Sequence, residues 1–162
     1  ELFLVATCNP DISLWNTAKV VSMQSMFNRA TAFNQPLNNW NTAAVTNMYG
    51  MFHGAIAFNQ PLNGWNTAAV IDMRYMFWRA SAFAQDLSRW NVASVTNMES
   101  MFTDGNAQMC ESFLPGGWGK ADVGGGTFCE SANMLKTAVT LPVELNFNLG
   151  EDFVYPVALF RF

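Results

Sequence analysis

Large apolar side chains return every 25 residues through the first part of the chain, and polar residues fill the positions between them. A fixed period of this size is the signature of a repeat solenoid, in which successive units stack. A single unit cannot bury its own apolar residues, but stacked units can, because each apolar slot meets the same slot in its neighbours. We therefore predict that the recurring side chains are internal. They are Trp15, Trp40, Trp65 and Trp90; Val20, Val45, Val70 and Val95; Met23, Met48, Met73 and Met98; Met26, Met51, Met76 and Met101; and Phe27, Phe52, Phe77 and Phe102.

The spacing inside each unit predicts its secondary structure. Val20, Met23 and Phe27 follow the three-to-four-residue spacing of a helical turn, whereas the stretch 33–40 carries Pro36 and paired asparagines and is expected to be extended or turned. We therefore predict an α/β-type repeat solenoid, leucine-rich-repeat-like, with a short strand plus a short helical turn in each 25-residue coil. The recurring asparagines are expected to satisfy backbone groups at turns, and a polar ligand-binding rail is the alternative.

The pattern changes towards the C-terminus. Residues 105–131 are glycine-rich, and from Val139 apolar and polar residues alternate on both sides of the loop 150–152, which predicts a β-hairpin. The chain is thus divided into a repeat solenoid over 1–131, with coils starting near Trp15, Trp40, Trp65 and Trp90 and degenerate ends, and a C-terminal β-hairpin over 132–162. The hairpin either caps the solenoid or docks on another subunit, with Phe160 and Phe162 as anchors.

The repeat itself carries a family resemblance. The run Trp-Asn-Thr-x-x-Val-Thr-Asn-Met-x-x-Met-Phe-x-x-Ala-x-x-Phe-Asn-Gln-x-Leu resembles the BspA-like surface-protein repeat found in many copies in Mycoplasma lipoproteins, and the likeness covers about residues 1–104. The resemblance implies a curved right-handed solenoid used for adhesion or protein binding, without catalysis. It also implies an extracellular or cell-surface location.

Composition and charge restrict the partners. Only 12% of the residues are charged and 51% are hydrophobic, so uncharged polar residues or a partner must cover much of the surface. The net charge of −4 and the lack of a basic cluster argue against nucleic acid. No apolar run has the roughly 20 residues of a transmembrane segment. Leu2, Cys8 and Ile12 fall in slots of a preceding unit, so we expect a segment of a longer protein.

Groups for catalysis or metal binding are scarce. His53 is the only histidine, and the three cysteines have no zinc-type spacing, so we expect no enzyme activity, no cofactor and no metal. Cys110 and Cys129 flank the glycine-rich stretch. They either form a disulfide or, together with Cys8, remain buried free thiols.

The positions that vary between units are the candidates for function, because the recurring positions are occupied by core residues. They form columns between the core slots and are expected to face outward. Aromatic and arginine side chains, which are typical of interface hot spots, gather in these columns. An ordinary surface that has drifted is the alternative interpretation. The candidate partner-binding residues are Tyr49, His53, Arg74, Tyr75, Trp78 and Arg79, together with Phe160 and Phe162 of the hairpin.

Three functions are compatible with this pattern. The first is a non-catalytic protein-protein interaction or adhesion module of a surface or secreted protein. The second is a peripheral structural subunit docked in a larger assembly, such as a membrane or organellar complex, which the low charge and the apolar hairpin favour. The third is a glycan-binding module that uses Trp78, Tyr75 and the asparagines. The identity of the protein partner is not encoded in these features.

Overall fold

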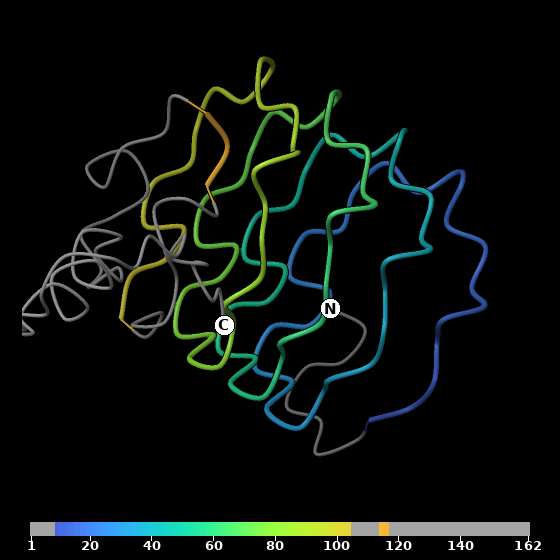
Figure 1. Cartoon of the computed structure of the whole chain (residues 1–162), viewed down its shortest axis with the longest axis vertical. Helices are drawn as coiled ribbons and strands as arrows, with labels where there is room; N and C mark the ends of the chain where they lie inside the picture. Colours follow the sequence, from blue (N-terminus) through green and yellow to red (C-terminus); the bar gives the residue numbers. More distant parts are fainter. Residues whose placement is uncertain (1–8, 105–113, 117–162) are drawn as a thin grey trace, which may run out of the picture.

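The computed structural model describes residues 9–104 and 114–116. In this part the chain winds through successive coils of one repeat each, which lie side by side with equivalent positions in register (Figure 1). Isolated parallel bridges at one position join each coil to the next; they pair Ser22 with Asn47, Asn47 with Asp72, and Asp72 with Asn97. The 25-residue period of the sequence is therefore the length of one coil.

The predicted secondary structure within each coil is wrong. Residues 9–104 and 114–116 contain no α-helix, and their only strand-type pairing is the row of single bridges. The α/β-type, leucine-rich-repeat-like fold class, with a strand and a helical turn per coil, is therefore overturned. The described coils consist of turns that are joined by hydrogen bonds to the neighbouring coils.

Alternating hydrogen bonds explain why a helical spacing produces no helix. Along residues 23–30, every second backbone N–H donates to a carbonyl of the next coil at N···O distances of 2.7–2.9 Å. These bonds join Met23 to Asn47, Ser25 to Tyr49, Phe27 to Met51 and Arg29 to His53. Of the N–H groups in between, those of Met26, Asn28 and Ala30 donate three residues back, and that of Gln24 donates to the Ser22 hydroxyl. An α-helix needs uniform bonds four residues back, so the alternation excludes it.

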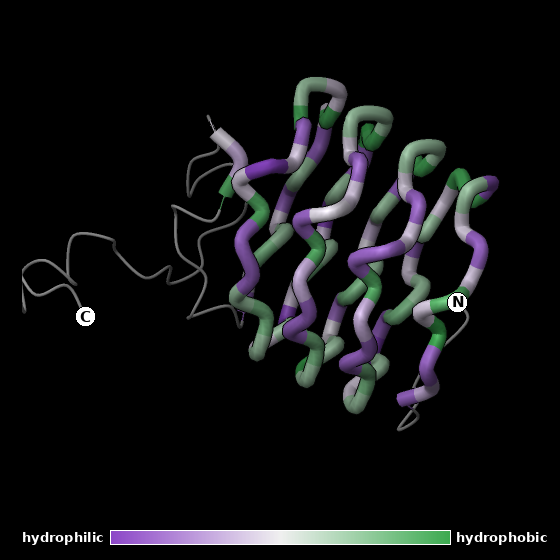
Figure 2. Tube along the Cα trace, turned by 45° about the vertical axis from the view of Figure 1, so that its right-hand side comes forward, coloured by the Kyte–Doolittle hydropathy of each residue, from purple (hydrophilic) through white to green (hydrophobic). Residues whose placement is uncertain are grey.

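The core consists of ladders that run through the stack. Met48, Met51 and Phe52 are fully buried, so the prediction that the recurring side chains are internal is confirmed for the middle coils. In the first and last described coils it holds only in part: Trp15 is 44% exposed, and Val20, Met26, Val95 and Met98 are partly buried. Phe52 stacks on Phe27 and Phe77, its equivalents in the two adjacent coils, at ring-centroid distances of 5.3 and 5.5 Å. Burial of each large side chain contributes about 1.5–3 kcal/mol, so these ladders dominate the stability of the stack. Figure 2 shows hydrophobic and hydrophilic segments recurring at equivalent places in successive coils.

Polar side chains form ladders of their own. The indole N–H of Trp65 donates to the carbonyl of Leu37 at 2.8 Å, and Trp40 and Trp90 repeat this contact one coil away on either side. The side-chain oxygen of Asn34 accepts from the backbone N–H of Asn59 at 3.0 Å. The side-chain oxygens of Asn16, Asn41, Asn66, Asn91 and Asn59 also accept backbone N–H groups, which confirms the prediction that the recurring asparagines satisfy backbone groups.

Several predictions fall outside the described residues. They concern the hairpin within 132–162, the boundary near residue 131, Phe160 and Phe162, and the pairing of Cys110 with Cys129. In the part that the structure describes, no helix has the length and apolarity to cross a membrane.

Candidate functional site

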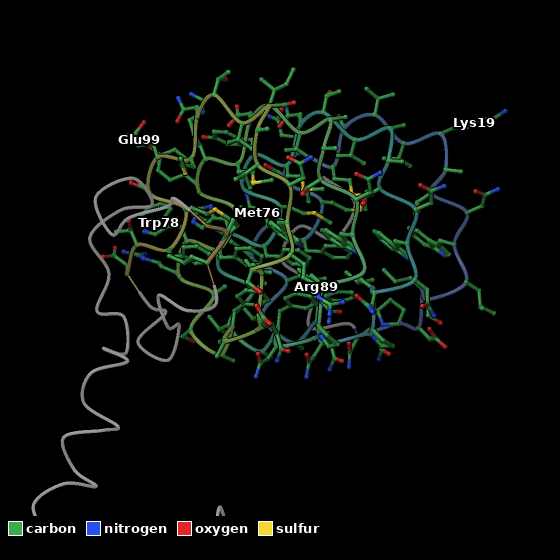
Figure 3. All side chains as sticks on the ribbon, turned by 45° about the horizontal axis from the view of Figure 1, so that its top comes forward. Lys19, Met76, Trp78, Arg89 and Glu99 are labelled. Atoms are coloured by element: carbon green, nitrogen blue, oxygen red, sulfur yellow. The ribbon has the colours of Figure 1, made fainter. Side chains whose placement is uncertain are left out.

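Two backbone positions in every coil orient the variable side chains. Tyr75 and Arg79 both have a φ of 56°, and Gly50 and Gly54 occupy the equivalent positions of the preceding coil with φ of 55° and 68°. These left-handed residues lie within the turns over 49–54 and 74–79. In Figure 3, Trp78 lies at the periphery, whereas the buried Met76 lies inside the stack. The variable columns therefore border the core on its outer side.

Four of the predicted residues form a continuous aromatic group. The rings of His53 and Trp78 stack with their centroids 4.5 Å apart. Tyr75 lies against Trp78 at 5.7 Å and meets the edge of Tyr49 at 5.6 Å. All four side chains are half-buried, so the expectation that the columns face fully outward holds only in part.

The two predicted arginines extend this group. Arg74 lies over the Tyr49 ring at 5.2 Å, and Arg79 lies over the Trp78 ring at 5.0 Å. Cation–π contacts of this kind hold a guanidinium flat against an aromatic face. The structure thus brings six of the eight predicted residues together, and we call them the aromatic–arginine cluster: Tyr49, His53, Arg74, Tyr75, Trp78 and Arg79.

Two aspartates that the sequence analysis did not select hold the arginines in place. Arg74 forms a salt bridge with Asp72, with 2.6 Å between Nη2 and Oδ2. Burial raises the pKa of Asp72, but the hydrogen bonds from Arg74 outweigh it, so the pKa is lowered overall. Asp104 accepts from the Trp78 indole N–H at 3.3 Å and pairs with Arg79 at 3.4 Å. The available signal was their repeat position: Asp72 replaces uncharged residues of the other coils, and Asp104 follows Arg79 at the equivalent position one coil later.

The surroundings of His53 disfavour its protonated form. Its partial burial against Trp78 lowers the pKa of the imidazole, and the positive charges of Arg29 and Arg79 lower the pKa further. Among the described residues, no group of three or more His, Cys, Asp or Glu side chains is placed to hold a metal ion. The cluster therefore consists of aromatic rings, an imidazole and two guanidinium groups that pack against one another at the half-buried edge of the coils.

A stack of equivalent coils with a constant core and a variable outer edge defines the molecule as a repeat protein. Residues 1–113 match the family described as Mycoplasma protein of unknown function, DUF285, and the chain belongs to this family. No curated protein and no solved structure matches the chain.

Proposed function

We propose that the chain is a non-catalytic protein–protein interaction module of a surface or secreted protein, and that the aromatic–arginine cluster is its contact surface. The observation that carries the proposal is the position of Trp78. It is a half-buried tryptophan outside the core ladders, and its faces are occupied by His53 and Arg79. The match to a Mycoplasma family supports the surface setting.

The composition of the cluster suits recognition of another protein. Tryptophan, tyrosine and arginine are the residue types that most often dominate the binding energy of interfaces. Here the cation–π contacts and ion pairs hold them in one arrangement before binding. Such preorganisation reduces the conformational entropy that is lost on association.

The test is affinity capture with the purified chain as bait, followed by crosslinking mass spectrometry. We expect crosslinks to map to the coil edges around Trp78, and Trp78→Ala to weaken capture at least about tenfold, as for an interface hot spot. Thr31→Ala serves as the control, because Thr31 is exposed and outside the cluster. Equal capture by Trp78→Ala and the unchanged chain, with equal melting temperatures, would contradict the proposal.

A second candidate is a structural subunit docked in a larger assembly. Exposed apolar side chains outside the cluster favour it, since Leu14 is 94% exposed and Val21 57% exposed. Size-exclusion chromatography distinguishes the two candidates. A monodisperse monomer supports the interaction module, whereas an isolated chain that aggregates supports the docked subunit.

A further inference from the structure

The variable column formed by residues 29, 54, 79 and 104 contains one arginine that has an acidic partner among the described residues and one that does not. In the coils that begin at Trp65 and Trp90, Arg79 is followed at the equivalent position by Asp104, and the two form an ion pair. Two coils before Arg79, the same position holds Arg29, and the coil between them holds Gly54. Within the described residues, Arg29 is exposed and forms no ion pair. The column therefore reads arginine, no side chain, arginine, aspartate.

Gly54 carries no side chain between the two arginines, and Arg29 lies against it. A Cβ built on Gly54 would lie 3.5 Å from Cγ of Arg29, which is ordinary van der Waals contact. Asp104 has a φ of 60° at the equivalent position, close to the 68° of Gly54. The fold thus accommodates a carboxylate-bearing residue at this position, and Gly54 leaves it without one.

We propose that Arg29 and Arg79 together bind a carboxylate side chain of the protein partner, seated over Gly54 as Asp104 is seated in its own coil. The inference rests on the proposed function and gives the partner its chemistry: an acidic segment with an apolar side chain next to the carboxylate. The carboxylate would complete a column of alternating charge. Its apolar neighbour would cover the His53–Trp78 ring stack.

Asn28 supplies a further donor on the same edge. In its own coil, Asn28 holds the repeat position that Trp78 holds two coils later, where Trp78 donates its indole N–H to Asp104. The side chain of Asn28 carries an amide NH₂ group. Its Oδ1 is buried and has no hydrogen-bond partner among the described residues. By its repeat position, Asn28 is the residue of its coil that corresponds to the donor of Asp104.

A carboxylate fits this place better than a phosphate. The chain carries a net charge of −4, and Asp104 already shares Arg79, so a doubly charged group would meet more repulsion than a singly charged one. Charge-assisted hydrogen bonds from guanidinium groups to a carboxylate are among the strongest that side chains form. A single glutamate or aspartate of a partner protein carries one negative charge and accepts charge-assisted hydrogen bonds from both guanidinium groups.

The experiment uses the NMR signals of His53, which is the only histidine of the chain. The probe is the blocked peptide Ac-Gly-Phe-Glu-Phe-Gly-NH₂, and its Gln counterpart is the control. Because Arg29 and Arg79 lower the pKa of His53, an anion bound between them is expected to raise it. We expect a saturable response to the Glu peptide and none to the Gln peptide. No response to the Glu peptide at up to about 10 mM, or a stronger response to inorganic phosphate, would overturn the inference.

Gly54→Asp provides the sharpest variant, because it fills the place with a carboxylate of the chain itself. We expect it to raise the His53 pKa without peptide and to weaken binding of the Glu peptide at least about tenfold, as should Arg29→Gln. Gly54→Asn is the matched control, since it has nearly the same size, tolerates the left-handed backbone and is neutral. If the Gly54→Asp and Gly54→Asn variants bound the Glu peptide with equal affinity, the carboxylate site would be refuted.

The outcomes separate this inference from the proposed function. If Trp78→Ala abolishes capture of the protein partner while Arg29→Gln and Gly54→Asp leave it unchanged, the carboxylate site is refuted and the interaction surface stands. If Trp78→Ala leaves capture unchanged, the proposed function fails, whatever the peptide does. Melting temperatures of all variants establish that they are folded.

Discussion

Two of the variable columns consist of residues with a left-handed backbone conformation. At positions 50 and 54 of one coil and 75 and 79 of the next, the backbone conformation is constant, and only the side chain changes from glycine to tyrosine or arginine. A non-glycine residue in this conformation costs about 1–2 kcal/mol. Ser25, Arg29, Ser100 and Asp104 share this conformation at the equivalent positions of other coils, so the strain belongs to the repeat as a whole.

His53 provides a prediction at this scale. Burial first, and then Arg29 and Arg79, lower its pKa from the usual 6.5 in the folded chain. The unfolded chain therefore binds a proton more readily, so the stability that depends on a neutral His53 is complete above pH 6.5 and decreases as the pH falls through the lower folded-state pKa. We expect the free energy of unfolding to fall more on acidification in the unchanged chain than in His53→Gln.

Urea unfolding at several pH values measures this difference, and NMR gives the pKa directly. Arg79→Gln is the matched variant, because it removes one of the positive charges and should move the pKa of His53 back towards 6.5. A His53 pKa at or above 6.5 in the folded chain would show that the imidazole is neither buried nor close to the two arginines.

At the scale of the element, each coil is a chain of turns whose hydrogen bonds are completed by its neighbours. The apolar spacing correctly predicted which side chains are buried, but we interpreted it as a helix. A helix and the observed chain of turns both place Met23, Phe27 and Ala30 on the buried side. What excludes the helix is the set of N–H groups that donate to the next coil. Those partners lie 24 residues away in sequence and are not visible in the spacing within one unit.

The tryptophan ladder gives a prediction for the element. Trp65 is 4% exposed and donates its indole N–H to the carbonyl of Leu37. Trp65→Phe retains an aromatic ring but leaves that carbonyl without this donor. The carbonyl still accepts from the backbone N–H of Trp40 at 3.0 Å, so we expect the free energy of unfolding to fall by about 0.5–1.5 kcal/mol, the net contribution of one hydrogen bond. Thermal or urea denaturation measures the change.

Trp15→Phe is the control for this prediction, because Trp15 belongs to the same ladder but is 44% exposed. It should destabilise the protein less than Trp65→Phe does. Equal losses in the two variants would indicate that ring volume, and not the buried hydrogen bond, accounts for the effect.

At the scale of the whole molecule, the described coils share one continuous core. Phe52 stacks on its equivalents in both adjacent coils and also on Phe58 of its own coil, with ring centroids 4.1 Å apart. Phe52→Ala would therefore remove contacts across three coils at once. We expect a loss of about 3–5 kcal/mol in the free energy of unfolding, measured by urea denaturation.

Ile56→Ala is the comparison for Phe52→Ala, because Ile56 is a large apolar residue of the same coil but is 50% exposed. Its loss should stay below about 1 kcal/mol. If the two variants were destabilised alike, the phenylalanine ladder would not be the main support of the stack.

The sequence by itself determined the period, the set of internal side chains and six members of the candidate site. Side chains that recur at fixed spacing are buried only where equivalent slots meet, and the residues left over must border that core. Only the tertiary structure decided that the coils are built from turns and that Asp72 and Asp104 anchor the arginines. The turns depend on backbone hydrogen bonds to the neighbouring coils, and the two ion pairs depend on where the folded backbone places each side chain, one within a coil and one between coils.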